Sequence, residues 1–199
     1  MSQVRINYWA EGPTDRAAAR KLIRHVGCEP GDDYSIRRKA SPGKDFLDKR
    51  ITSFNAAAHY NPWLVLRDGD GVCAADLSAQ LLPRPAQYMC FRVVVPAIEA
   101  WLLADRQAFA TALAVGATQL PEYPEDIVEV KRCVIELASR SRSRSVREDL
   151  PPRPQSGRHE GQGYAQFLIG FINETWHPNR AAKNAPSLRR AIKRLETMC

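Results

Sequence analysis

The sequence lacks several signatures that would assign a protein class at once. It has no Gly-x-x-x-x-Gly-Lys-[Ser/Thr] motif, which excludes ATP hydrolysis through a P-loop. It has 5 cysteines, an odd number, and no two of them form a Cys-x-x-Cys pair. We therefore expect reduced, mostly buried thiols rather than a zinc knuckle or a disulfide framework. No apolar stretch approaches membrane-spanning length, and no apolar signal segment follows the N-terminus. We therefore expect a cytoplasmic protein with no membrane partner.

Acidic residues are outnumbered by basic ones. The chain has 22 Asp and Glu against 29 Lys and Arg, a formal net charge of +7. Such an excess attracts polyanions such as nucleic acids, although many unrelated proteins are equally basic. The 199 residues suffice for one domain with a hydrophobic core, or for one domain with a small helical addition.

Strand-like and helix-like patterns alternate in the first half of the chain. The expected strands cover residues 4–10, 34–38, 63–67 and 88–95. The last is nearly continuous in apolar residues, as is typical of a central strand buried on both faces. Apolar residues at helical spacing lie between the strands. This order predicts an α/β fold with a mainly parallel four-stranded sheet flanked by helices.

The pattern changes after residue 96, where only helical segments are expected. We predict a first domain over 1–105 and a helical C-terminal extension over 106–199. Within the extension, the Ser/Arg/Pro-rich segment 139–160 has too few apolar residues to order itself, and we expect it to be mobile. Arginines alternate with serines at its start. The segment is then either a solvated linker or an arm that contacts phosphates.

Acidic residues stand where two of the expected strands end. Glu11 follows the first strand, and Asp68 and Asp70 follow the third. In an open parallel sheet, ligands bind just outside the carboxyl ends of the strands, so neighbouring strands would bring the three carboxylates together. Such clusters hold Mg²⁺, which acts on phosphates. Taken singly, Glu11 also suits a helix N-terminus, and Asp68-Gly69-Asp70-Gly71 also suits a polar turn.

These residues resemble the TOPRIM domain, which topoisomerases, bacterial primases and OLD-family nucleases share. Its signature is a Glu after the first strand and an Asp-x-Asp after the third, and the resemblance covers about residues 4–105. A longer pattern is similar to that of a bacterial TOPRIM-like family called domain of unknown function 4276. It consists of Glu-Gly-x-Thr-[Asp/Glu], then Arg-Asp-x-Asp, and then the segment 98–105. That family is thought to be related to OLD nucleases. It is often encoded beside ATPases, a setting that suggests phage defence.

The resemblance implies roles for individual residues. Asp68 and Asp70 would bind Mg²⁺ or Mn²⁺, and Glu11 would be a metal ligand or a general acid/base. Glu99 is the extra acid of the longer pattern: it would complete a second metal site, hydrogen-bond the ligands, or simply start a helix. OLD nucleases also carry a lysine near their metals, for which Lys183 and Lys44 are the candidates.

The function expected from this pattern is metal-dependent phosphodiester cleavage of DNA or RNA, as a nuclease that acts beside an ATPase partner. The expected phosphate contacts are Arg67, Arg140, Arg142, Arg144 and Lys183. Two alternatives stay open. One is a catalytically silent subunit that binds nucleic acid or a partner. The other follows from the Asp68–Val72 string, which also resembles the first motif of haloacid-dehalogenase-like phosphatases, a minor alternative that leaves Glu11 unexplained.

Overall fold

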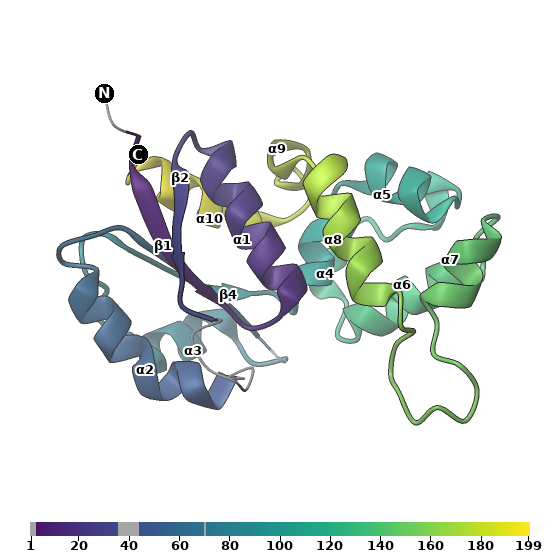
Figure 1. Cartoon of the computed structure of the whole chain (residues 1–199), viewed down its shortest axis with the longest axis horizontal. Helices are drawn as coiled ribbons and strands as arrows, with labels where there is room; N and C mark the ends of the chain where they lie inside the picture. The colour runs from purple at the N-terminus through teal and green to yellow at the C-terminus, as the bar shows by residue number, and fades with distance from the viewer. Residues whose placement is uncertain (1–2, 36–43, 70) are drawn as a thin grey trace.

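Four parallel strands form the centre of the molecule. The computed structural model describes residues 3–35, 44–69 and 71–199. The strands β1 (Arg5–Ala10), β2 (Glu29–Asp33), β3 (Trp63–Asp68) and β4 (Met89–Val94) lie in the order β2-β1-β3-β4 (Figure 1). All neighbouring pairs are parallel, which confirms the predicted four-stranded α/β sheet. The chain crosses from β1 to β2 on one side and then to β3 on the other, so the strand order reverses between β1 and β3.

The second strand is not where the sequence placed it. We expected it at 34–38, but β2 covers Glu29–Asp33, and residues 36–38 lie outside the described residues. β2 is a polar edge strand, where proline is tolerated. Asn7 on β1 fixes it, because its side-chain oxygen accepts the backbone N–H of Asp32 at 3.0 Å. An edge strand held by backbone and polar contacts carries little of the apolar pattern on which the prediction depended.

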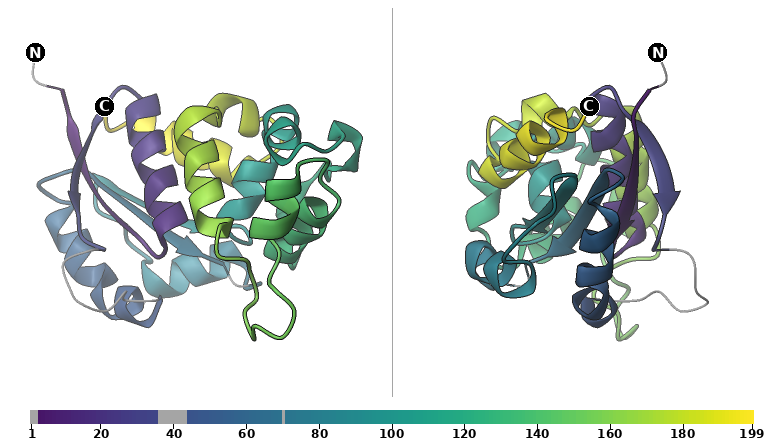
Figure 2. Two further views of the ribbon diagram at one scale, coloured as in Figure 1. Left: turned by 45° about the vertical axis from the view of Figure 1, so that its right-hand side comes forward. Right: turned by 90° about the vertical axis from the view of Figure 1, so that its left-hand side faces the viewer.

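Helices cover both faces of the sheet, and side chains alternate between two cores. On one face, α2 (Lys44–Ala57) and α3 (Ala74–Leu81) pack on Trp9, Trp63 and Val65. On the other face, α1 (Pro13–His25) shares a core with strand residues that include Ile6, Tyr8 and Leu64. Figure 2 shows α2 and α3 on one side of the sheet and the C-terminal helices continuing the opposite side.

The second core continues without a break into the C-terminal helices. These helices are α4 (Ile98–Leu103), α5 (Arg106–Leu113), α6 (Val130–Ser139), α7 (Arg144–Asp149), α8 (Tyr164–Glu174), α9 (Pro178–Ala181) and α10 (Pro186–Glu196), with short 3-10 turns at Ala117–Gln119 and Pro124–Asp126. The helical extension therefore forms, with α8 beside α1 and α10 against β4. The boundary predicted at residue 105 stays a prediction. Across the described ranges, no helix is both long and apolar enough to cross a membrane.

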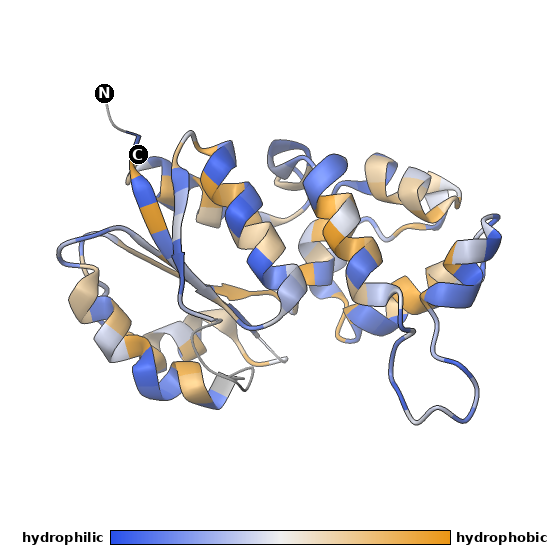
Figure 3. Ribbon diagram, viewed as in Figure 1, coloured by the Kyte–Doolittle hydropathy of each residue, from blue (hydrophilic) through white to orange (hydrophobic). Residues whose placement is uncertain are grey.

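Part of the segment 139–160 is folded, in contrast to the expected lack of ordered structure. α7 forms inside it, and Val146 and Leu150 are buried in the main core. These two apolar residues lie four positions apart on one helix face, a weak signal among the surrounding serines and arginines. Residues 151–163 then form a mostly hydrophilic loop between α7 and α8 (Figure 3).

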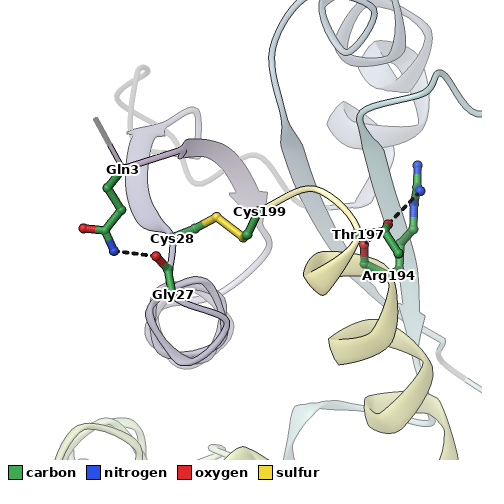
Figure 4. Close-up of a disulfide and its surroundings, with 6 residues drawn as sticks. All are labelled: Gln3, Gly27, Cys28, Arg194, Thr197 and Cys199. Atoms are coloured by element: carbon green, nitrogen blue, oxygen red, sulfur yellow. Dashed lines mark hydrogen bonds between the residues drawn. A yellow bond between two sulfur atoms is a disulfide. The ribbon is translucent and has the colours of Figure 1, made fainter. Parts of the chain in front are cut away.

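Two of the cysteines form a disulfide bond, which corrects the expectation of reduced thiols. Cys28 and Cys199 are 171 residues apart in sequence, and their Cα atoms lie 6.0 Å apart (Figure 4). The bond joins the residue before β2 to the residues after α10, and Gln3 donates a hydrogen bond to the neighbouring Gly27 carbonyl. Sequence spacing carries no information on a pair that only tertiary folding brings together. Cys73, Cys90 and Cys133 are free thiols.

Candidate functional site

Glu11 and Asp68 lie at the carboxyl ends of adjacent strands. Ala10 and Leu66 face each other in the register of β1 and β3, so Glu11 follows one strand where Asp68 ends the other. Both side chains are half-buried. The two predicted acids therefore share one edge of the sheet, here called the carboxyl edge, next to the point where strand order reverses. Asp70 lies outside the described residues, and its predicted place in the site stays a prediction.

Asp15, in the first turn of α1, is an acid at this edge to which the sequence analysis gave no role. Its carboxylate accepts the backbone N–H of Gly12 at 3.0 Å, and the residue is only 8 % exposed. Burial first, and then the negative charges of Glu99 and Glu11, raise the pKa of Asp15 to about 6. The available signal was its place as the last residue of the Glu-Gly-x-Thr-[Asp/Glu] pattern, although an acid at that place is equally typical of the start of a helix.

Glu99 lies in the first turn of α4, which follows β4 after Pro96 and Ala97. It is buried, and its Oε1 accepts the Tyr164 hydroxyl at 3.1 Å. Burial, together with the charge of Glu99, raises the pKa of Tyr164 well above its usual range, so its hydroxyl stays a donor. Glu99 also acts electrostatically on Asp15. The structure therefore brings Glu99 to the carboxyl edge, whereas its role in metal binding stays a prediction.

Lys131, on α6, is a cation that faces these acids. Partial burial opposes its charge, but the carboxylates of Glu99, Glu160 and Asp68 outweigh that effect and raise the pKa of Lys131. Its Nζ lies 3.1 Å from a carboxylate oxygen of Glu160. The sequence offered no signal for this lysine, because it comes from the helical region and reaches the carboxyl edge only through tertiary packing.

Of the two lysines named from the sequence, Lys183 lies away from the carboxyl edge. Lys183 is exposed and lines a separate pocket of about 290 Å³ between α9 and α10. The side chain of Lys44 lies outside the described part of the chain. The lysine that interacts with Asp68 and Glu99 is instead Lys131.

Arg67 supports the end of β3 from inside the protein. It is 7 % exposed, and its Nε and one terminal nitrogen donate to the carboxylate of Asp48 at 3.0 and 3.2 Å. Its other terminal nitrogen donates to the backbone carbonyl of Asp68 at 2.8 Å. This bidentate pair fixes the strand end on which a candidate ligand sits. The placement does not favour the phosphate contact predicted for Arg67.

The arginines of the Ser-Arg tract lie on the surface of the helical region. Arg140, Arg142 and Arg144 are exposed. The backbone of Arg142 is fixed by its N–H, which donates to the carbonyl of Ala114 at 3.1 Å, and Arg144 pairs with Glu148 at 2.7 Å. Their side chains are open to an anion, and the predicted phosphate contacts stay predictions.

The donor chemistry of the carboxyl edge suits a divalent metal, although the described residues do not complete a site. In residues 3–35, 44–69 and 71–199, no three His, Cys, Asp or Glu side chains are grouped to hold a metal ion. Carboxylate oxygens are the ligands that Mg²⁺ prefers. Besides burial, the negative charges of Glu99 and Glu11 raise the pKa of Asp15, and a divalent cation would neutralise this excess of negative charge. A complete ligand set would use Asp70 beside Asp68 and Glu11.

A pocket of about 640 Å³ adjoins the carboxyl edge. It lies among the segments that follow β3 and β4, the first residues of α6 and the α7–α8 loop. Its lining includes Gly71, Ala97, Val128, Lys131, Arg132 and Ile135, with Pro152 and His159 from the loop. Lys131 and His159 also line a neighbouring pocket of about 440 Å³ that includes Arg158. Lys131, which interacts electrostatically with Glu99 and Asp68, lines both pockets.

Comparison of the chain with family models, curated proteins and solved structures gives no match. Function is therefore inferred from the placement of these residues and from the motif to which they belong.

Proposed function

We propose that the chain cleaves phosphodiester bonds of DNA or RNA in a reaction that depends on Mg²⁺ or Mn²⁺. The observation that carries the proposal is the gathering of Glu11, Asp15 and Glu99 with Asp68 at the carboxyl edge. In open parallel sheets this edge, next to the reversal of strand order, is where substrates bind. The net charge of +7 favours a polyanionic substrate.

Each residue of the site has a role in this proposal. Asp68 and Asp70, with Glu11, would hold the metal, which polarises the phosphate and lowers the pKa of a bound water when present. Asp15, with a pKa of about 6, can take up or release a proton near neutral pH. Tyr164 orients Glu99 by donating a hydrogen bond to it. Lys131 supplies a positive charge beside the acids, where a substrate phosphate would lie.

The sequence resemblance extends the proposal to a setting. As a TOPRIM-like effector, the chain would act beside an ATPase in phage defence. A pull-down with the protein encoded next to it tests this part separately from the chemistry.

The experiment that tests the chemistry is a cleavage assay on plasmid DNA, single-stranded DNA and RNA with Mg²⁺ or Mn²⁺. Glu11→Gln should lower the cleavage rate by about 10²–10⁴-fold, because the general acid/base or ligand oxygen is lost. Glu29→Gln is the matched control, since Glu29 is exposed and begins β2 at the opposite edge of the sheet. Cleavage by Glu11→Gln at the wild-type rate would contradict the assignment.

The net charge of +7 also suits a catalytically silent subunit that binds nucleic acid, which is the second candidate. Such a protein would bind nucleic acid with strong salt dependence and form no product with either metal.

A further inference from the structure

We propose that the pocket of about 640 Å³, here called the Val128 pocket, receives an unpaired base of the substrate. The site would then act on single-stranded nucleic acid or on unpaired ends. The inference rests on the proposed function, because the pocket adjoins the same acids. The inference adds the class of nucleic acid on which the site acts, which the Glu and Asp-x-Asp motifs leave open.

The size and lining of the Val128 pocket suit a nucleobase. Its volume lies within the range of sites that enclose small ligands. Val128, Val130 and Ile135 give it an apolar wall, and Val128 is 82 % exposed, so its side chain is accessible to a ligand. A flat base buries apolar surface against such a wall. A base inside a duplex is stacked and paired, so it reaches a pocket only after leaving the helix.

Cations lie along the rim of the same pocket. Lys131 and Arg132 line it, and their side chains are 50 % and 71 % exposed. Carboxylates of Glu160 and Glu129 hold these two side chains at the rim, at 3.1 and 3.2 Å. Arg158 continues the row of cations into the neighbouring pocket. A strand with one base in the pocket would pass its phosphates along these cations.

The pocket also leads to the acids. Gly71 and Ala97 both line the pocket. Gly71 follows the end of β3 shortly after Asp68, and Ala97 lies two residues before Glu99. Lys131 belongs to the pocket and interacts with both Asp68 and Glu99. A base held here would place an adjoining phosphate beside the carboxyl edge, which is the positioning that cleavage needs. An unpaired nucleotide combines the apolar body and the negative charge that these surroundings recognise.

Fluorescence anisotropy in EDTA tests the inference without cleavage. The probes are a labelled single strand, a blunt-ended hairpin duplex that has the same number of phosphates and a loop of abasic residues, and the single strand with every nucleotide abasic. The wild type should bind the single strand about tenfold more tightly than either other probe, because neither of them offers an unpaired base to the pocket. Val128→Asn should weaken single-strand binding by roughly three- to tenfold and leave abasic binding unchanged. Val4→Asn is the matched control, since Val4 is exposed before β1 and outside the pocket.

Equal wild-type affinity for the single strand and the hairpin overturns the inference, as does wild-type affinity in Val128→Asn. Cleavage assays separate this outcome from failure of the proposed function. Equal cleavage of hairpin and single strand with Mg²⁺ would remove the inference and leave the nuclease proposal standing. If binding depends on the unpaired base but no cleavage occurs with either metal, the nuclease proposal is removed and the inference stands.

Discussion

The two faces of the sheet differ in how they are covered and in what they give to the carboxyl edge. The α2–α3 face is covered by the helices that directly precede and follow β3. On this face Phe54 stacks on Trp63, with their ring centroids 4.9 Å apart. It supports the end of β3 through Arg67 and Asp48. The opposite face is closed by α1 and by helices from the far half of the chain.

The helices of this second face bring charged and polar groups to the acids. Asp15 comes from α1, Glu99 from α4, Lys131 from α6 and Tyr164 from α8. The helical extension therefore belongs to the candidate site as well as to the core. Perturbing this face should change stability and activity together, whereas perturbing the α2–α3 face should change mainly stability.

Truncating one large aromatic side chain on each face should give the largest effect and test this difference directly. Trp101 on α4 is fully buried, and its Nε1 donates to the Ser187 hydroxyl at 2.7 Å. Trp101→Ala should lower the free energy of unfolding by about 3–5 kcal/mol and reduce the cleavage rate of the folded fraction, because α4 carries Glu99. Phe54→Ala should lower the free energy of unfolding by about 3 kcal/mol and leave the cleavage rate unchanged. Denaturant unfolding and cleavage assays measure both. A rate loss in Phe54→Ala equal to that in Trp101→Ala would erase the distinction.

The raised pKa of Asp15, on α1, predicts a pH dependence of stability that arises on the second face of the sheet. Because the folded state holds the proton up to about pH 6, and the unfolded state releases it near the ordinary value of 3.8, stability should fall as pH rises between these values. The loss attributable to Asp15 is roughly 2–3 kcal/mol. Asp15→Asn should remove this loss and still accept the Gly12 N–H, so the variant should be the more stable protein above pH 6.

Urea unfolding across this pH range, without divalent metal, measures the effect. The charges of Glu99 and Glu11 add to the effect of burial on the pKa of Asp15, so each should also be replaced by Gln in a separate series. Asp76→Asn is the matched control, because Asp76 occupies the same position in the first turn of α3 and is exposed. Parallel stability curves for wild type and Asp15→Asn would show that the carboxyl is not perturbed.

Removing one hydroxyl should give a smaller change. Tyr164→Phe deletes the donor to buried Glu99 and should lower the free energy of unfolding by about 1–3 kcal/mol. Tyr123→Phe should change it by less than about 0.5 kcal/mol, because Tyr123 is 64 % exposed. Thermal and denaturant unfolding compare the two variants. Equal effects would mean that the Tyr164 hydroxyl does not support Glu99.

The exposed arginines should have the smallest effect on stability. Replacing Arg140, Arg142 and Arg144 with Ala should change the free energy of unfolding by about 0.5 kcal/mol or less, since the Arg144–Glu148 pair is exposed. If these arginines bind phosphates, the slope of the salt dependence should fall by about one unit for each arginine that does so. Ala at Arg189, Arg190 and Lys193 on α10 is the control of equal charge. An unchanged slope would assign the tract to a structural role.

The sequence predicted those features that depend on neighbours along the chain. Alternating patterns located β1, β3, β4 and the first three helices, and the acids at strand ends placed Glu11 and Asp68 at one edge. β2 was misplaced because a polar edge strand buries little. α7 was missed because two buried apolar residues, Val146 and Leu150, are hidden among arginines and serines.

The remaining parts of the site depend on packing between distant segments. Lys131 and Tyr164 reach the acids only because α6 and α8 pack on the same core as the sheet. Periodicity describes which face of a helix is buried but not which other helix it meets. The pairing of Cys28 with Cys199 is hidden from sequence for the same reason.

The Cys28–Cys199 bridge makes most of the polypeptide a covalent ring. Every strand from β2 onward and every helix after α1 lies within the ring, including the exposed α7–α8 loop. A single protease cut in that loop would leave two fragments joined through the sulfur atoms, and they would migrate together on a gel until a reductant is added. A cut between Asp15 and Cys28 would have the opposite result, because it would detach Glu11 and Asp15 from the ring that carries Asp68, Glu99 and Lys131.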